Sequence, residues 1–325
     1  MFMKRGLKIV GIAILVIAVL IVLVVVFSQV KNYIHSQKQW LDEDYYTQFQ
    51  SDSLLEKKYA GLGKYSVSSK VVKSEDKAIG NIRIWYPTEL ESKMEKYPVV
   101  FVTNGSNTAA LNYEPCFERL ASWGFIVVGN DDRQTGTGES ASKMLDYMLE
   151  QNVDSDSIFY GKVDEENIGI TGYSQGGAGA LRAVTEYDNS NQYKAIFTGS
   201  ASYSLLAKNM GWEYDMTKVT IPYFMTAGTG TSDDRGIKDI NVEFGGVAPL
   251  VSLIENYDTM TGDIFKVRAR VTGAEHEEIQ MKTDGYMTAW MLCQLQGDEE
   301  AGKVFIGENA EILNNPNWQD IEKNR

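Results

Sequence analysis

Short apolar runs that alternate with segments of helical spacing constrain the fold of this chain most strongly. The runs are typical of fully buried strands: PVVFV from Pro98, FIVV from Phe125, IGIT from Ile168, KAIFT from Lys194, YFMTA from Tyr223 and KVRARV from Lys266. The segments of helical spacing cover residues 113–122, 141–151, 176–187 and 283–296. This alternation predicts an α/β fold, a mostly parallel twisted sheet with helices on both faces. Upstream, YSVSSKVV and IRIWYP alternate in period two around a polar turn, which predicts an N-terminal antiparallel hairpin.

Composition excludes several classes of protein. With 43% hydrophobic residues and 11% aromatics, the chain has enough apolar surface for a packed core, so it is not mostly disordered. Its 31 Lys and Arg against 44 Asp and Glu give a net charge of −13, which argues against a nucleic-acid partner. Two cysteines are too few for a disulfide framework or a cysteine-rich metal site.

Residues 9–27 read IVGIAILVIAVLIVLVVVF, an uncharged stretch long enough to cross a bilayer as a helix. Lys4, Arg5 and Lys8 precede it, so the positive-inside rule predicts a cytoplasmic N-terminus and an extracellular remainder at the cell membrane. The sequence at the end of this stretch, FSQVKNYIHS, has no small-x-small cleavage site, which favours an uncleaved signal anchor over a long signal peptide that is removed. Without these three basic residues the net charge falls from −13 to −16, so the exported part is strongly acidic.

This reading divides the chain into three parts. Residues 1–28 are expected to form the cytoplasmic segment and the signal-anchor transmembrane helix, which binds the lipid bilayer through residues 9–27. Residues 29–63 are polar with mixed charges, so we expect a stalk or linker. Residues 64–325 are expected to form a single α/β domain.

The segment IGITGYSQGGAGALRAVTEY carries the strongest chemical signal. A predicted strand runs into Gly172-Tyr173-Ser174-Gln175-Gly176 and then into a predicted helix, which is the sequence pattern of a nucleophile elbow. Gly172 and Gly176 leave room for the sharp turn, and Ser174 is expected to be strained with its hydroxyl exposed. The alternative is an ordinary glycine-rich turn between a strand and a helix.

A serine hydroxyl needs a base, usually histidine, and the chain has two histidines. His35 lies just beyond the apolar stretch, away from the predicted sheet. His276 follows the last predicted strand in VTGAEHEEI, so it is the predicted base, although an exposed histidine in an acidic loop would give the same sequence.

The acid that orients the histidine should lie between serine and histidine in this kind of fold. The strand IPYFMTA ends in AGTGTSDDRG, where Asp233 and Asp234 are both suitably placed. We predict Asp233, with Asp234 as the main alternative and helix or turn capping as the non-catalytic reading of either.

Two backbone amides are expected to hold a developing oxyanion. One belongs to Gln175, directly after the nucleophile, and the other belongs to Ser106, after Gly105 in the loop that follows the first buried parallel strand. Tyr173 is the aromatic side chain that we expect to contact substrate. Asp131 and Asp132 have no companion cluster in sequence, so we expect neither a metal nor a cofactor.

Together, PVVFVTNGSN, RLASWGFIVVGND, VDEENIGITGYSQGGAGA, AGTGTSD and GAEH resemble the α/β-hydrolase superfamily. Within it they are most similar to the branch of dienelactone-hydrolase-like, chlorophyllase-like and cutinase-like (polyester hydrolase) enzymes. The resemblance covers roughly residues 80–296 and implies an oxyanion hole that matches Ser106 and Gln175. It also implies that the helices containing Cys116 and Cys293 flank the same face of the sheet, so these residues either pair or remain free thiols.

The sequence therefore predicts a membrane-anchored, outward-facing serine hydrolase that cleaves small-molecule or polymeric carboxylic esters through Ser174, His276 and Asp233. Peptidase, thioesterase or acyltransferase chemistry remains open because the triad alone does not separate them. A binding module that retained the fold without catalysis is the third alternative.

Overall fold

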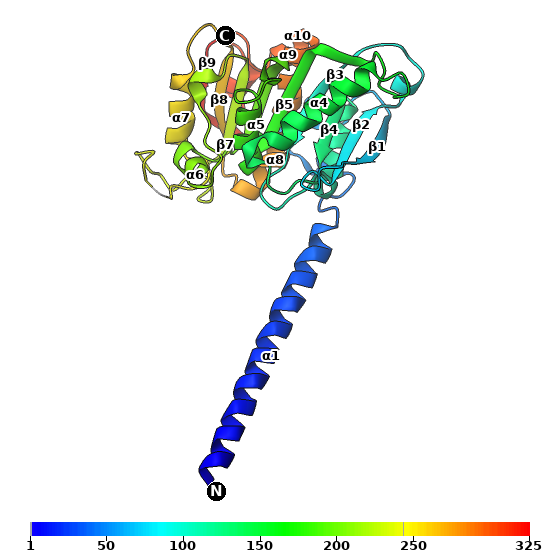
Figure 1. The fold of residues 1–325 in the computed structure, drawn as a ribbon. Coiled ribbons are helices and arrows are strands. Elements are labelled where there is room, and N and C mark those ends of the chain that lie inside the picture. The colour runs from blue at the N-terminus through cyan, green and yellow to red at the C-terminus, as the bar shows by residue number, and fades with distance from the viewer. Residues whose placement is uncertain (1, 243) are drawn as a thin grey trace.

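The computed structural model describes residues 2–242 and 244–325, with side chains placed from Ile14 onward. In this part of the chain nine strands form one sheet in the order β1-β2-β4-β3-β5-β6-β7-β8-β9 (Figure 1). The strands are β1 (Val67–Lys73), β2 (Asn81–Pro87), β3 (Tyr97–Thr103), β4 (Ile126–Asn130), β5 (Val163–Tyr173), β6 (Tyr193–Gly199), β7 (Tyr223–Gly228), β8 (Lys266–Val271) and β9 (Trp318–Lys323).

The centre of the sheet is parallel, as the apolar runs predicted. Neighbours from β4 through β3, β5, β6 and β7 to β8 all pair in parallel. The predicted hairpin is confirmed as the antiparallel pair β1 and β2, and β2 also pairs antiparallel with β4. An antiparallel edge strand, β9, pairs with β8 and was not predicted because WQDIEK is short and polar.

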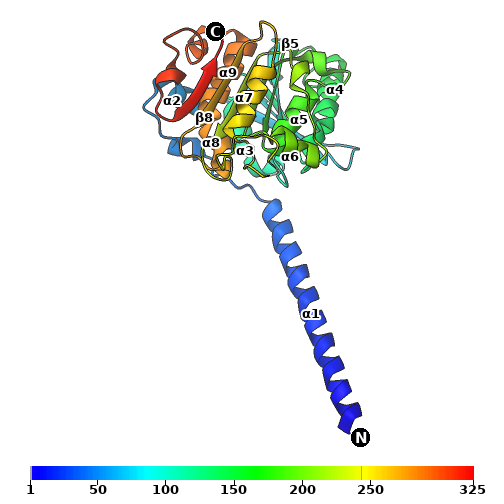
Figure 2. The same cartoon turned by 90° about the vertical axis from the view of Figure 1, so that its left-hand side faces the viewer.

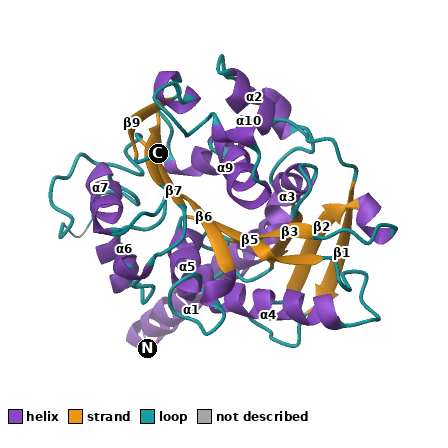
Figure 3. Cartoon of the chain, turned by 90° about the horizontal axis from the view of Figure 1, so that it is seen from above, coloured by secondary structure: helices purple, strands orange, loops and turns teal. Residues whose placement is uncertain are grey.

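Helices cover both faces of the sheet (Figure 3). On one face, α4 (Glu139–Val153), α5 (Gln175–Ala183) and α7 (Leu250–Thr259) contribute to an apolar cluster with Ile and Val side chains of the central strands. On the other face, α2 (Leu54–Ala60), α3 (Glu114–Ala121) and α9 (Asp284–Gln296) pack around Trp290 and Phe224. Three short helices complete the described part: α6 (Ser204–Asn209), α8 (Ile279–Lys282) and α10 (Glu299–Gly302).

The N-terminal helix α1 (Phe2–Ser36) projects from the globular part as an isolated rod (Figures 1 and 2). Within its segment Ile14–Ser36, an 18-residue window has a mean hydropathy of 2.8 and is not buried against the rest of the chain. By length and composition this helix is able to cross a membrane.

The prediction that residues 29–63 form a stalk is wrong for most of this segment. Helix α1 continues through Ser36, and the following segment packs against the domain, with Tyr59 fully buried and α2 lying against α9. Two polar contacts hold it there: the Tyr45 hydroxyl donates to Asp284 at 2.5 Å, and Glu311 accepts the N–H groups of Leu55 and Glu56. The boundary predicted at residue 64 therefore cuts through a packed unit.

Candidate active site

Ser174 occupies a strained turn between β5 and α5. Its backbone angles are φ 57° and ψ −122°, a conformation that residues with a side chain rarely adopt. A Cβ on Gly172 would lie 2.2 Å from the carbonyl oxygen of Gly176, and a Cβ on Gly176 would lie 2.2 Å from that of Thr103. Both glycines are therefore needed for the turn, and the sequence pattern of a nucleophile elbow is matched in three dimensions.

His276 lies beside Ser174 although 102 residues separate them in sequence. It follows β8, and its Nε2 lies 2.9 Å from the Ser174 hydroxyl oxygen. Tyr173 supports the imidazole in two ways: its ring stacks on that of His276 at 4.9 Å, and its hydroxyl donates to the His276 carbonyl at 2.7 Å. The arrangement leaves the ring plane of the histidine fixed and its Nε2 aimed at the serine.

Asp233 completes the constellation from the loop after β7. Its Oδ1 lies 2.7 Å from His276 Nδ1, and its side chain is fully buried. The other carboxylate oxygen accepts hydrogen bonds from the Ser200 hydroxyl at 2.5 Å and the Gly228 amide at 2.6 Å. These donors compensate a buried carboxylate for the water it has lost.

The neighbouring Asp234 points to a different partner. Its Oδ2 accepts from Arg270 Nη1 at 2.5 Å and from the Leu250 amide at 3.3 Å. Its Oδ1 accepts from the Gly236 amide at 2.8 Å. These contacts secure the loop against β8 and the start of α7, so of the two aspartates Asp233 is the one beside His276.

A second pair of side chains, not identified from the sequence, fixes the backbone of His276. The Ser232 hydroxyl accepts the His276 amide at 2.8 Å and itself donates to the carboxylate of Glu275. Glu275 also accepts the Ser232 amide at 2.9 Å, and the hydrogen bond from the Ser232 hydroxyl lowers the pKa of this carboxyl below its usual range. Glu275 therefore helps to fix the backbone of the loop that carries the predicted base, a contact that the sequence did not reveal.

Gln175 directly follows the serine, and the loop that carries Ser106 packs against the elbow, since a Cβ on Gly176 would lie 2.4 Å from the Asn104 carbonyl oxygen. Neither of the two predicted donor amides has an acceptor among the described residues. In the loop after β3, the next two amides are occupied: Asn107 donates to the Arg133 carbonyl at 3.0 Å and Thr108 to the Gly105 carbonyl at 3.2 Å. Ser106 thus retains a free N–H in an exposed position. Gln175 begins α5, where the amides of the first turn have no intrahelical acceptor.

A small cavity of about 50 Å³ lies behind this site. Its lining includes Gly105, Tyr173, Cys116 and Met287, but none of Ser174, His276 or Asp233. Such a volume holds one or two water molecules and not an acyl chain. The predicted contact of Tyr173 with substrate stays a prediction, because the contacts of this side chain in the structure are with His276 and with this cavity.

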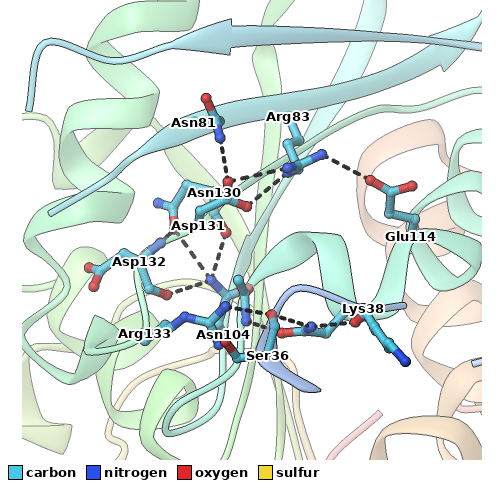
Figure 4. Close-up of polar contacts among 12 residues, drawn as sticks. Ser36, Lys38, Asn81, Arg83, Asn104, Glu114, Asn130, Asp131, Asp132 and Arg133 are labelled. Carbon is cyan, nitrogen blue, oxygen red and sulfur yellow. Dashed lines mark hydrogen bonds and ion pairs between the residues drawn. The ribbon is translucent and has the colours of Figure 1, made fainter. Parts of the chain in front are cut away.

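The remaining sequence candidates have structural partners. Asp131 accepts from Arg83 Nε at 2.8 Å and from Asn81 at 2.6 Å (Figure 4). Asp132 accepts the Gln134 amide at 2.8 Å. Cys116 and Cys293 are both free thiols, Cys116 buried and Cys293 half-buried, so the alternative of a disulfide between them is not realised.

Comparisons with known proteins agree with this fold. The sequence model of the PET hydrolase-like family matches residues 47–230. Cutinase 1 from Thermobifida cellulosilytica is 24% identical over 258 residues, which are 76% of this chain and 85% of that protein. A cutinase from Thermobifida fusca (strain YX) is 24% identical over the same share of this chain and 74% of its own length. Lipase 1 from Moraxella sp. (strain TA144) is 29% identical over 126 residues, 38% of this chain and 39% of that protein.

The match to the family model begins at residue 47, inside the segment that packs on the domain, and extends through the serine elbow to the end of β7. The α/β fold and the resemblance stated from the sequence are thereby confirmed. The chain belongs to the PET hydrolase-like family of α/β-hydrolases and is a carboxylic ester hydrolase.

Proposed function

We propose that this chain is a membrane-anchored, extracytoplasmic serine hydrolase that cleaves carboxylic esters through Ser174, His276 and Asp233. The observation that carries the proposal is the continuous contact from the Ser174 hydroxyl through both ring nitrogens of His276 to the buried carboxylate of Asp233. This is the geometry in which a neutral imidazole removes the proton of a serine hydroxyl.

The first half of the reaction transfers the acyl group to the enzyme. Ser174 Oγ attacks the ester carbonyl carbon and its proton moves to His276 Nε2, while Asp233 accepts a hydrogen bond from Nδ1–H and stabilises the imidazolium. The amides of Ser106 and Gln175 donate to the carbonyl oxygen as it becomes negative. The bond from carbon to the alkoxy oxygen then breaks, and the alcohol leaves with the proton from Nε2.

The second half regenerates the enzyme. A water molecule gives a proton to His276 Nε2 as it attacks the acyl carbon, and the bond to Ser174 Oγ breaks as that oxygen takes the proton back. The carboxylic acid is released. Asp233 also accepts hydrogen bonds from the Ser200 hydroxyl and the Gly228 amide, which hold its carboxylate in place beside His276.

The proposal of a membrane anchor is based on helix α1. The apolar stretch at residues 9–27 has the length of a membrane span, and Lys4, Arg5 and Lys8 precede it, which favours a cytoplasmic N-terminus. We assign the cytoplasmic segment and the signal-anchor transmembrane helix to residues 1–28, with residues 9–27 in the bilayer, and the hydrolase to the extracellular side of the cell membrane.

Labelling by a fluorophosphonate probe tests the mechanism. The purified chain is expected to react at Ser174 and to hydrolyse short p-nitrophenyl esters, whereas the Ser174→Ala variant neither labels nor turns over. His276→Ala is expected to lower both rates at least a thousandfold. An unmodified chain that neither labels nor cleaves these esters contradicts the proposal. A panel with matched amides and thioesters separates esterase from peptidase or thioesterase activity.

A further inference from the structure

The end of helix α1 is bound directly to loops at the edge of the sheet where the parallel strands end, which we call the carboxyl edge. The Ser36 carbonyl accepts hydrogen bonds from Arg133 Nη2 at 2.7 Å and Asn112 Nδ2 at 3.0 Å (Figure 4). Asn112 also donates to the Lys38 carbonyl at 2.6 Å. The last carbonyls of a helix lack intrahelical donors, so these side chains cap the helix and attach it to the domain.

The same arginine also holds the loop that carries a proposed oxyanion donor. Arg133 donates through Nη1 to the Asn107 carbonyl at 2.7 Å, and its own carbonyl accepts the Asn107 amide at 3.0 Å. Asn107 directly follows Ser106. One side chain therefore connects the end of the helix to the rim of the active site.

Aromatic packing fixes the direction in which the chain leaves the helix. Trp40 stacks on His35 at 5.1 Å and donates through Nε1 to the His35 carbonyl at 3.0 Å. Its backbone N–H donates to the Asn112 carbonyl at 2.9 Å, and its ring packs edge-on against Tyr113. These contacts join the last turn of α1 to the start of α3, so the exit is not a free linker.

The length of α1 places this edge close to a bilayer. The apolar stretch ends at Phe27, nine residues before Ser36. At a rise of about 1.5 Å per residue, Ser36 stands roughly 13 Å above the hydrocarbon core. The headgroup layer on each side is about 5–8 Å thick. The carboxyl edge would then face the membrane across a gap of less than about 10 Å.

Two perpendicular views agree with this geometry. Helix α1 leaves the domain on the side where α8, the short helix after His276, is located, while the C-terminus lies on the opposite side (Figures 1 and 2). Exposed apolar side chains also occur in loops of the carboxyl edge, at Met210 after β6 and at Val242 and Phe244 after β7. Such side chains suit contact with the apolar boundary of a bilayer.

We propose that the active site faces the membrane from which α1 rises and that its substrates are ester lipids held in that membrane. This inference rests on the proposed function. The exported part carries a formal charge of −16, which disfavours close approach to anionic headgroups and favours neutral or zwitterionic lipids. An ester in the same bilayer as the anchor also meets the site at a high local concentration without diffusing through water.

The experiment lengthens helix α1, so that the domain stands farther from the membrane but keeps its orientation about the helix axis. An insertion of 18 residues of helix-forming Glu-Ala-Ala-Ala-Lys repeats between Gln29 and Val30 adds five full turns, about 27 Å, and preserves the phase of the helix. The full chain is reconstituted in phosphatidylcholine vesicles that contain a fluorogenic diacylglycerol ester. A short p-nitrophenyl ester in solution reports the basal activity. The matched control has the same insertion between Met3 and Lys4, on the other side of the apolar stretch.

We expect the raised variant to lose at least tenfold in the rate on the lipid ester and to keep its rate on the soluble ester within twofold. The control is expected to keep both rates. Equal rates on the lipid ester for the raised and unmodified chains overturn the inference, as does an unmodified chain that cleaves the soluble ester but not the lipid. An unmodified chain that neither reacts with the fluorophosphonate probe nor cleaves either ester overturns the proposed function itself.

Discussion

Asp233 and Asp234 are adjacent in the chain, yet their carboxylates bind different parts of the molecule. Asp233 is fully buried between His276, Ser200 and Gly228, whereas Asp234 forms an ion pair with Arg270. The sequence motif left both as candidates, because a pair of aspartates after a strand does not reveal which side chain turns toward the histidine. Packing of the following loop against Arg270 makes the distinction.

This difference predicts opposite outcomes for two isosteric variants. Asp233→Asn is expected to lower kcat about a thousandfold or more, because an amide no longer stabilises the imidazolium or fixes its tautomer. Asp234→Asn is expected to keep kcat within a few-fold and to lower the melting temperature, because it weakens a largely buried ion pair. Steady-state ester hydrolysis and thermal unfolding measure both effects. A large loss of kcat in Asp234→Asn with little in Asp233→Asn would assign the acid to the other residue.

The two thiols provide a prediction about pH. Burial is the largest cause of the raised pKa of both thiols. It raises the pKa of Cys116 well above its usual range and that of Cys293 to about 11. Both groups are then neutral thiols at pH 8, and the thiolate is the reactive form. We expect slow alkylation by iodoacetamide in the folded protein at pH 8, faster reaction of Cys293 as the pH approaches 11, and two labels per chain in denaturant. A disulfide-linked product in the absence of reductant would contradict the free thiols.

At the scale of elements, the segment between α1 and β1 is a structural part of the hydrolase. Arg119 is fully buried and donates to the Tyr59 carbonyl at 2.7 Å and the Tyr45 hydroxyl at 3.0 Å. It also lies 3.3 Å from the carboxylate of Asp284 at the start of α9. Removing the segment would leave this buried charge without two of its acceptors, which is costly in a core.

Two truncations test this role. A chain that begins at Lys38 retains every contact of Tyr45, Glu56 and Tyr59, so we expect it to fold as stably as the intact domain. A chain that begins at Lys64 is expected to lose several kcal/mol of unfolding free energy or to fail to fold, because buried polar groups lose partners and Tyr59 leaves the core. Urea unfolding followed by circular dichroism compares them. Equal urea midpoints for the two truncated chains would support the stalk that the sequence predicted for this segment.

The elements that could be predicted are those whose signal is local. The runs at β3, β5, β6 and β7 are largely apolar because both faces of the sheet are covered, and their pattern is visible in a single window of sequence. The N-terminal segment gave no such signal. Its decisive contact, Tyr45 with Asp284, joins residues 239 apart, and neither residue is apolar or part of a motif.

The same limit applies to the site. The positions of Ser174 and His276 were predictable because a motif and a scarcity of histidine point to them, whereas the order of the triad left Asp233 and Asp234 as candidates for the acid. The hydrogen bonds from Ser232 to Glu275 and His276 were not predictable. They join two loops 43 to 44 residues apart, and serine and glutamate are ordinary residues for exposed turns.

At the scale of the molecule, one end of the domain carries both the proposed site and the attachment of α1. In a sheet of parallel strands the loops at the carboxyl edge collect reactive groups regardless of the rest of the chain. Attachment at that edge, through Arg133 and Asn112, is a separate property of this chain. In the proposed membrane-anchored arrangement, this attachment determines which substrates the site can reach.

The proposed membrane topology concerns the whole molecule, and cysteine accessibility tests it. Leu54 is 80% exposed on α2, so a Leu54→Cys variant is expected to react with a membrane-impermeant maleimide in intact cells. A Phe2→Cys variant is expected to react only after the membrane is permeabilised, because Lys4, Arg5 and Lys8 before the apolar stretch predict a cytoplasmic N-terminus by the positive-inside rule. The unmodified chain, whose two thiols are buried or half-buried, provides the background at neutral pH. Labelling of Phe2→Cys in intact cells would reverse the orientation, and a mature protein that lacks this residue would show that the helix is a cleaved signal peptide.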